Sequence, residues 1–132
     1  MEFKISKNFF KELKKYIKSN NKVELDILLK DMHHADIAEI LEKLNFKNAI
    51  YLFKVLDSEK TAEVLLELDE DLREKILNRL SPKEIAEELD ELETNDAADI
   101  IAELSESKKS QVISEILDEE HAKDIVDLLR YP

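Results

Sequence analysis

Residues 45–92 read NFKNAIYLFKVL, DSEKTAEVLLEL, DEDLREKILNRL and SPKEIAEELDEL when the chain is cut every twelve residues. Each of these segments ends in leucine and has an apolar residue at its ninth position. The same cut extends in both directions. Segments begin at Asn21, His33, Asn45, Asp57, Asp69, Ser81, Glu93 and Ser105, and after one extra residue a ninth begins at Asp118. An internal repeat of this kind decides the fold class before any other feature is considered.

The apolar positions of the repeat define one face of a short helix. The ninth position is apolar in all nine segments, and the eighth is apolar in all but one, where Glu88 stands. The twelfth is assigned to Met32, Leu44, Leu56, Leu68, Leu80, Leu92, Leu104, Leu117 and Leu129. With the variable fifth position, these residues give the i, i+3, i+4, i+7 spacing of a core-facing helix.

The repeat length excludes one continuous helix. Twelve residues at about 100° each advance the apolar face by about 1200°, which displaces it by about 120° in every segment. The chain must therefore break and restart each time. Asn, Asp or Ser begins seven of the nine segments and can cap a new helix, and Pro82 suits a first helical position. We expect helices of about nine residues, and a longer turn near residues 105–110.

These features predict an all-α fold. The chain has no glycine and two prolines, whereas a sheet protein of 132 residues would need glycine in its hairpin turns. Stacked short helices predict a right-handed α-superhelix, or solenoid, of about nine to ten helices on a 24-residue hairpin repeat. Residues 1–132 are predicted to form a single domain, with acidic repeats over residues 21–132.

Residues 1–20 precede the repeat and are predicted to form a basic amphipathic helix. Its apolar stripe consists of Phe9, Phe10, Leu13, Tyr16 and Ile17, with lysines elsewhere on the helix. Such a helix can cap the first repeat, lie on a membrane surface or dock on an acidic partner. The chain contains no apolar run long enough for a transmembrane helix. We also expect no signal peptide.

Charge and composition narrow the function classes. Residues 1–23 carry a net charge of +5 and residues 24–132 a net charge of −17, which disfavours nucleic-acid binding and attracts cations or a basic partner. Because the chain has no cysteine and no nucleophile motif, we do not expect it to be an enzyme.

His33 and His34 lie at a helix start and could join a metal site. These two histidines and His121 are expected to face solvent.

Acidic residues recur at the seventh position. Glu39, Glu63 and Glu87 are 24 residues apart, which would align them on one face of stacked hairpins, and Asp99 and Asp124 hold the same position. Asp96 and Asp99 are three residues apart on one helix face near a helix start. This pattern is compatible with a magnesium or calcium site. It is equally compatible with ordinary acids on the outer face of a helical repeat.

Several stretches resemble the amino-terminal domain of the MgtE family of magnesium transporters. They are HHADIAEILEKL (33–44), TAEVLLEL (61–68), NDAADIIAEL (95–104) and LLRYP (128–132), and the resemblance covers residues 21–132. His34 replaces the usual proline of the first stretch, and Asn95 stands where the family often has an acid. Asn95 can still offer a neutral oxygen, with one negative charge fewer.

The resemblance implies a regulatory domain on the cytoplasmic side of the cell membrane. In this family the helical domain precedes CBS domains and a transmembrane pore in the same polypeptide, and the whole protein forms a homodimer. Mg²⁺ between acidic faces of the helical and CBS domains keeps the pore shut. Carried over, the metal residues are Glu63, Asp96 and Asp99, with Asn95 as a fourth. Membrane contact is expected only through the transmembrane part.

Two other functions remain open from the residues alone. The domain could belong to a soluble CBS-linked sensor without a pore. It could instead be an armadillo-like scaffold resembling the flagellar motor-switch protein FliG, which would bind a protein partner and have no role for magnesium.

Overall fold

The computed structural model describes residues 7–130 of the chain, and every regular element in this range is an α-helix. The helices are α1 (Lys7–Lys18), α2 (Lys22–Leu29), α3 (His34–Lys43), α4 (Phe46–Val55), α5 (Ser58–Glu67), α6 (Glu70–Arg79), α7 (Pro82–Leu89), α8 (Thr94–Ala102), α9 (Glu106–Glu115) and α10 (Glu119–Arg130). The predicted all-α class is confirmed. The first six residues of the predicted end-cap segment and the last two of LLRYP lie outside the described residues.

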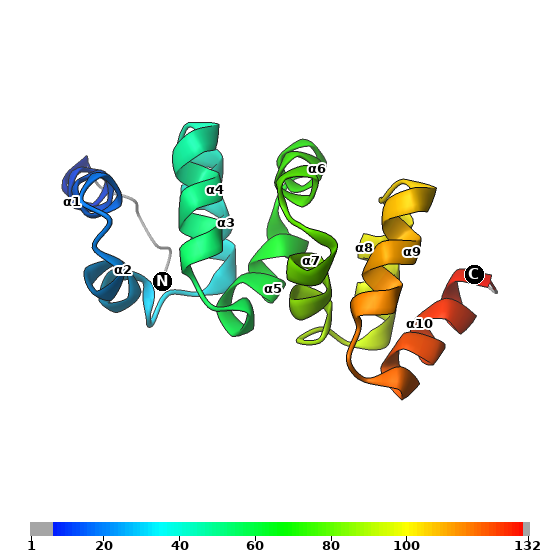
Figure 1. The fold of residues 1–132 in the computed structure, drawn as a ribbon. Helices are drawn as coiled ribbons and strands as arrows, with labels where there is room; N and C mark the ends of the chain where they lie inside the picture. The colour runs from blue at the N-terminus through cyan, green and yellow to red at the C-terminus, as the bar shows by residue number, and fades with distance from the viewer. Residues whose placement is uncertain (1–6, 131–132) are drawn as a thin grey trace. The chain divides into compact units, whose positions relative to one another are not determined.

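The helices group into two compact units, residues 1–68 and 69–132. In the amino-terminal unit α3 packs on α5 and α4, while α1 packs on α2 and α4 (Figure 1). In the carboxy-terminal unit α7 packs on α9, and α8 packs on α10 and α9. The closest packing in both units therefore includes helices that are two apart in the chain. The single domain and the right-handed superhelix stay predictions.

Helix starts fall where the repeat places them. Side-chain atoms of Asn21, His33, Asn45, Asp69, Ser81 and Ser105 accept hydrogen bonds from backbone N–H groups of the helices that follow them. Asp118 Oδ1 does the same for Glu120 and His121 at the start of α10. At Ser81 the cap is reciprocal, because the Glu84 carboxylate also accepts from the Ser81 N–H.

Two details of the predicted breaks are wrong. Asp57 precedes α5 as expected, but its side chain makes no capping hydrogen bond. The longer turn expected near residues 105–110 is absent, since Ser105 caps α9 directly and the helix covers residues 106–115. The irregular junction lies instead at residues 116–118, where the repeat gains its extra residue.

The ninth position stays in the core through α8, whereas Ile113 of α9 and Val126 of α10 are half-buried. The ninth-position residues from Leu29 to Ile101 are all at most 2% exposed. The assignment of Leu117 to the core is wrong: Leu117 is 87% exposed, whereas Ile116 is 7% exposed. Ile116 is the true twelfth residue counted from Ser105, so Leu117 is the inserted residue and projects outward. Glu88 is buried at its apolar position, as is the hydroxyl-bearing Thr61.

The connections explain how the chain turns without glycine. After α3, Leu44 and Asn45 both adopt extended backbone angles, and Leu56 and Asp57 repeat this after α4. The leucine side chain enters the core while the next residue starts a helix, so two extended residues suffice. Only at Asn20 does a described residue other than glycine adopt a positive φ, of 54°, a conformation that Asn tolerates at a helix end.

Lysines at the fourth position of two segments reach back to earlier helix ends. Lys60 Nζ donates to the carbonyl oxygens of Lys30 and Met32 at 2.7 and 3.0 Å. Lys108 Nζ donates to Leu77 O at 2.8 Å. Carbonyl groups at helix ends lack partners within the helix, so these bonds satisfy them and bind helices together inside each unit.

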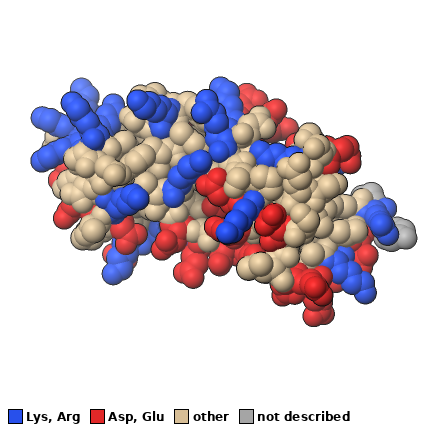
Figure 2. Space-filling model, viewed as in Figure 1, with Lys and Arg blue, Asp and Glu red and all other residues tan. Residues whose placement is uncertain are grey.

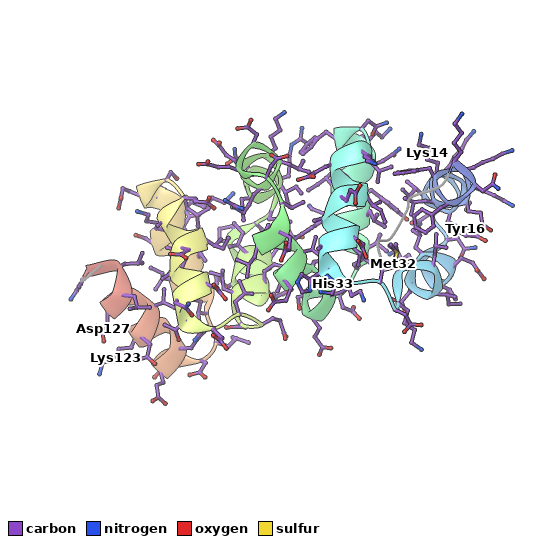
Figure 3. The ribbon with its side chains drawn as sticks, turned by 180° about the vertical axis from the view of Figure 1, so that it is seen from behind. Lys14, Tyr16, Met32, His33, Lys123 and Asp127 are labelled. Atoms are coloured by element: carbon purple, nitrogen blue, oxygen red, sulfur yellow. The ribbon has the colours of Figure 1, made fainter. Side chains whose placement is uncertain are left out.

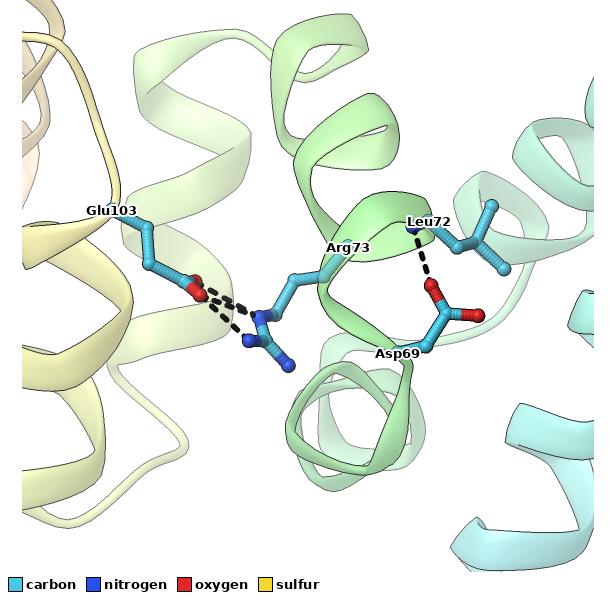
Figure 4. A network of polar contacts seen from close by, with 4 residues as sticks. All are labelled: Asp69, Leu72, Arg73 and Glu103. Carbon is cyan, nitrogen blue, oxygen red and sulfur yellow. Dashed lines mark hydrogen bonds and ion pairs between the residues drawn. The ribbon is translucent and has the colours of Figure 1, made fainter.

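An ion pair occupies a core-facing position in the carboxy-terminal unit. Arg73, at the fifth position of its segment, binds the Glu103 carboxylate through Nε at 2.9 and 3.2 Å and through one terminal nitrogen at 2.6 Å (Figure 4). Nearby, Asp69 accepts from the Leu72 N–H at 2.9 Å. The hydrogen bond to Glu103 raises the pKa of Arg73 against the opposing effect of partial burial, so the guanidinium stays charged.

We expect Leu65→Ala or Leu89→Ala to lower the free energy of unfolding by about 2–5 kcal/mol, because each fully buried leucine would leave a cavity. Leu117→Ala removes the same atoms from an 87% exposed side chain and should change stability by less than about 0.5 kcal/mol. Urea unfolding of the three variants measures both. Equal losses at Leu117 and Leu65 would disprove the repeat register.

A second comparison tests the helix caps with two variants, one at a capping residue and one at a residue that makes no capping bond. Ser81→Ala should cost about 1 kcal/mol because it removes the acceptor for the Glu84 N–H, whereas Asp57→Ala should cost clearly less because Asp57 makes no such bond. Thermal unfolding of both variants tests the difference. A larger loss for Asp57→Ala would contradict the capping assignments.

Candidate functional site

The sequence-predicted metal residues of the carboxy-terminal unit lie at the start of α8. Asn95 and Asp96 are in its first turn and Asp99 follows one turn later; Asp96 is half-buried, and the other two are exposed. The spacing of three residues places Asp96 and Asp99 on neighbouring positions of one helix face. The preceding residue, Glu93, makes no side-chain capping bond, so the start of this helix carries unneutralised acids. Negative charge is favoured at this end of a helix.

Glu63 lies in the amino-terminal unit, on the outer face of α5, and is exposed. It holds the seventh position, as does Glu39 on α3, and these two helices pack on one another. In the carboxy-terminal unit Asp99 and Asp124 share this position on the packed helices α8 and α10. The expected placement of seventh-position acids on an outer face is therefore observed within each unit.

Several acidic side chains of both units have partners, and the candidate acids are not among them. Glu39 pairs with Lys43 at 3.2 Å, Glu67 with His34 at 3.4 Å, and Glu103 with Arg73. Within the described residues, Glu63, Asp96 and Asp99 make no ion pair or side-chain hydrogen bond. Their oxygens are available to an external cation or donor.

Two of the three histidines, His33 and His121, have structural roles that the sequence did not predict. His33, which is labelled in Figure 3, precedes α3. Its Nδ1 accepts from the Ala35 N–H at 3.1 Å, so it acts as a helix cap. His121, expected to face solvent, is half-buried on α10. Its Nε2 lies 3.2 Å from Leu89 O and its Nδ1 lies 3.5 Å from Thr94 Oγ1. His121 thus joins the first turn of α10 to the end of α7 and the start of α8.

An acidic hollow of about 430 Å³ opens beside His121 in the carboxy-terminal unit. Its lining includes Asp90, Glu93, Asp118 and His121. Burial raises the pKa of the Asp90 carboxyl; His121 opposes this rise, and Asp118 and Glu87 increase it. Sequence reasoning missed this cluster because its members come from the end of α7 and from the two starts of α8 and α10. Only packing brings them together.

Within residues 7–130 no group of three or more histidine or acidic side chains is arranged to hold a metal ion. Magnesium keeps several of its waters and is commonly held by one or two carboxylates, so Asp96 and Asp99, with the Asn95 amide oxygen, suit part of such a site. They do not form a complete one. Within the described residues these three side chains are therefore too few to enclose a magnesium ion.

Comparison with protein families matches residues 32–132 to the family described as the MgtE intracellular N domain. The chain belongs to this family. The match confirms the resemblance seen in the sequence and covers α3 to the end of the chain, including all four predicted metal residues.

A solved structure supports the assignment of this MgtE N domain. The crystal structure of the soluble part of a magnesium transporter shares 25% sequence identity with the chain and superposes with a TM-score of 0.80. The match covers 95% of this chain and 49% of the other, so the N domain spans about half of that structure. No curated protein sequence matches the chain. None of its described helices is long and apolar enough to cross a bilayer.

The raised pKa of Asp90 gives a pH-dependent prediction for the N domain. A raised pKa means that the folded domain favours the neutral Asp90 carboxyl. The neutral carboxyl therefore contributes to the free energy of unfolding in full below the unfolded-state pKa of about 3.9. This contribution is lost as pH rises through the folded-state pKa. Asp90→Asn should therefore be more stable than the natural chain at neutral pH and equally stable in stronger acid. Denaturant unfolding across pH measures the difference.

The control is Asp71→Asn, which removes an exposed aspartate from the first turn of α6. There the negative charge is favoured by the helix dipole, so its loss should slightly destabilise the domain at neutral pH. If both variants shift stability in the same direction, the cost of partly burying the charged Asp90 carboxylate is not the cause.

Proposed function

We propose that this domain is the magnesium-responsive regulatory domain of a magnesium transporter, placed on the cytoplasmic side of the membrane. The observation that carries the proposal is the set of partnerless carboxylates Glu63, Asp96 and Asp99 within the region that matches the MgtE N domain. The similar solved structure, described as the soluble part of a magnesium transporter, supports the same assignment.

The chemistry of the exposed acids explains why a partner domain is required. Asp96 and Asp99 supply two carboxylates from one helix face, and Asn95 adds a neutral oxygen. Because the described residues hold no larger cluster, the isolated domain binds Mg²⁺ weakly. CBS domains of the same polypeptide supply the remaining ligands in this proposal, and the whole protein is a homodimer.

The charge of the domain supplies the switching force. Residues 24–132 carry a net charge of −17, so an acidic partner surface is repelled unless cations lie between the two. Mg²⁺ at the interface offsets this repulsion and holds the domains together, which keeps the pore closed. When magnesium falls, the repulsion separates the domains and releases the pore. The role is regulatory rather than catalytic.

We expect the full-length protein to become more compact and more resistant to proteolysis in millimolar magnesium than in sodium chloride of equal ionic strength. Matching ionic strength separates specific binding from general screening. Glu63→Ala, Asp96→Ala and Asp99→Ala should each weaken the response, because each removes an available ligand. Small-angle scattering and limited proteolysis report compactness and protection.

Two controls match the chemistry of these variants. Glu12→Ala removes a glutamate from α1, and Asp71→Ala removes an aspartate from the first turn of another helix. Neither should alter the magnesium response. If magnesium changes neither compactness nor cleavage at matched ionic strength, the regulatory mechanism fails and a protein-binding scaffold becomes the better account.

A further inference from the structure

Four lysines of α1 form a stripe along one side of the helix. Lys7, Lys11, Lys14 and Lys18 are spaced by four, three and four residues, which keeps them on one face, and all four are exposed. Figure 2 shows lysines gathered over this end of the amino-terminal unit. The stripe is about 16 Å long from first to last residue. Glu12, the acid of this helix, falls on a different face.

Two further lysines face the stripe across open hollows. A hollow of about 490 Å³ is lined by Phe10, Lys43 and three stripe lysines, namely Lys7, Lys11 and Lys14. A second, of about 540 Å³, is lined by Lys14, Ile17, Lys18, Asn45, Lys47, Asn48 and Tyr51. No acidic side chain belongs to either lining. Lys14 belongs to both hollows, so together they make one basic surface, which we name the lysine face.

The packing of α1 fixes where this face points. Leu13 and Ile17 are buried against the unit, so the apolar side of α1 is already used. After the helix, the Asn21 N–H donates to Tyr16 O at 2.9 Å, and the Tyr51 hydroxyl of α4 donates to the Asn20 side chain. The helix therefore packs on α2 and α4, and its role as an end cap stays a prediction. Its lysine stripe remains available on another side.

Like charges gathered in this way call for an external anion. Lys43 pairs with Glu39, but the other five lysines make no ion pair within the described residues. Among residues 7–130 no ion pair offsets the mutual repulsion of these five lysines. An anionic surface placed against the lysine face would relieve it.

We propose that the lysine face docks on the surface of an anionic lipid bilayer. Clusters of four to eight lysines on an amphipathic helix are typical of binding to anionic headgroups. The exposed ammonium groups suit a diffuse layer of phosphates; the lining holds no arginine to clasp a single compact ligand. Half-buried Phe10 lines the same hollow as three of the stripe lysines, and an aromatic side chain beside lysines suits the boundary between headgroups and water.

Net charge favours a membrane over nucleic acid. Residues 24–132 carry a net charge of −17, so a long polyanion that wraps the domain would be repelled, whereas a surface that touches the lysine face meets lysines. Docking would therefore orient the domain. This inference rests on the proposed function in one respect, which is that a membrane lies near the domain. It adds a direct contact between the domain and that membrane, besides the contact made by a transmembrane part.

The test is co-sedimentation of the chain with vesicles in low salt and without magnesium. Vesicles of phosphatidylcholine with about one-third phosphatidylglycerol should bind the chain, and vesicles of phosphatidylcholine alone should not. Changing Lys7, Lys11, Lys14 and Lys18 to Gln should lower the partition coefficient at least about a hundredfold, because each lysine near the surface contributes roughly a fivefold factor. Added sodium chloride should also release the chain.

A matched variant keeps the test specific. The control variant changes four exposed lysines outside the lysine face to Gln, namely Lys30, Lys75, Lys83 and Lys123. It has the same net charge as the α1 variant and should bind vesicles within about threefold of the natural chain. Circular dichroism verifies that both variants fold. Failure of the natural chain to bind anionic vesicles, equal losses in the two variants, or preference for an acidic peptide or single-stranded RNA would overturn the proposal. Because magnesium is absent, these outcomes leave the magnesium-driven compaction untouched.

Discussion

A helix that turns about 100° per residue cannot keep one face toward the core if its apolar pattern repeats every twelve residues. The chain resolves this conflict by breaking after each segment, with a buried leucine and a capping residue in extended conformation, as at Leu44 and Asn45. Helices of eight to twelve residues are marginal alone. Each therefore depends on its neighbours for a covered apolar face, and the polar faces are left outside with positions fixed by the repeat.

This constraint also determines where charge accumulates. Because the seventh position lies outside the core, acids placed there stay accessible, as Glu63 and Asp99 do. The basic α1 packs on α2 and α4 and keeps its stripe lysines exposed. The two proposed binding surfaces, one acidic and one basic, arise because the repeat keeps charged residues out of the core. Acidic helix faces are left for cations and a partner domain, and the lysine face is left for an anionic surface. Neither surface competes with the core for residues.

The sequence predicted the helix starts because capping residues and apolar spacing are local. It failed at Leu117, where one inserted residue shifted the register and Ile116 took the core position. It also failed wherever distant segments meet: His121 contacts Leu89 and Thr94, which are 32 and 27 residues away, and Arg73 finds Glu103 at a distance of 30 residues. Glu63, Asp96 and Asp99 were named through family resemblance. The structure adds that none of the three has a partner within residues 7–130, with Glu63 and Asp99 exposed and Asp96 half-buried, and their role stays a prediction.

The most direct test of the central claim is a calorimetric comparison of magnesium affinity between this chain alone and the full-length protein, both in buffers of equal ionic strength. A site shared between two domains predicts at least about tenfold tighter binding by the full-length protein, or about 1.4 kcal/mol. It also predicts that Asp96→Ala removes most of this gain. Equal affinities in the two proteins would show that the exposed carboxylates do not await a partner, and would contradict the account.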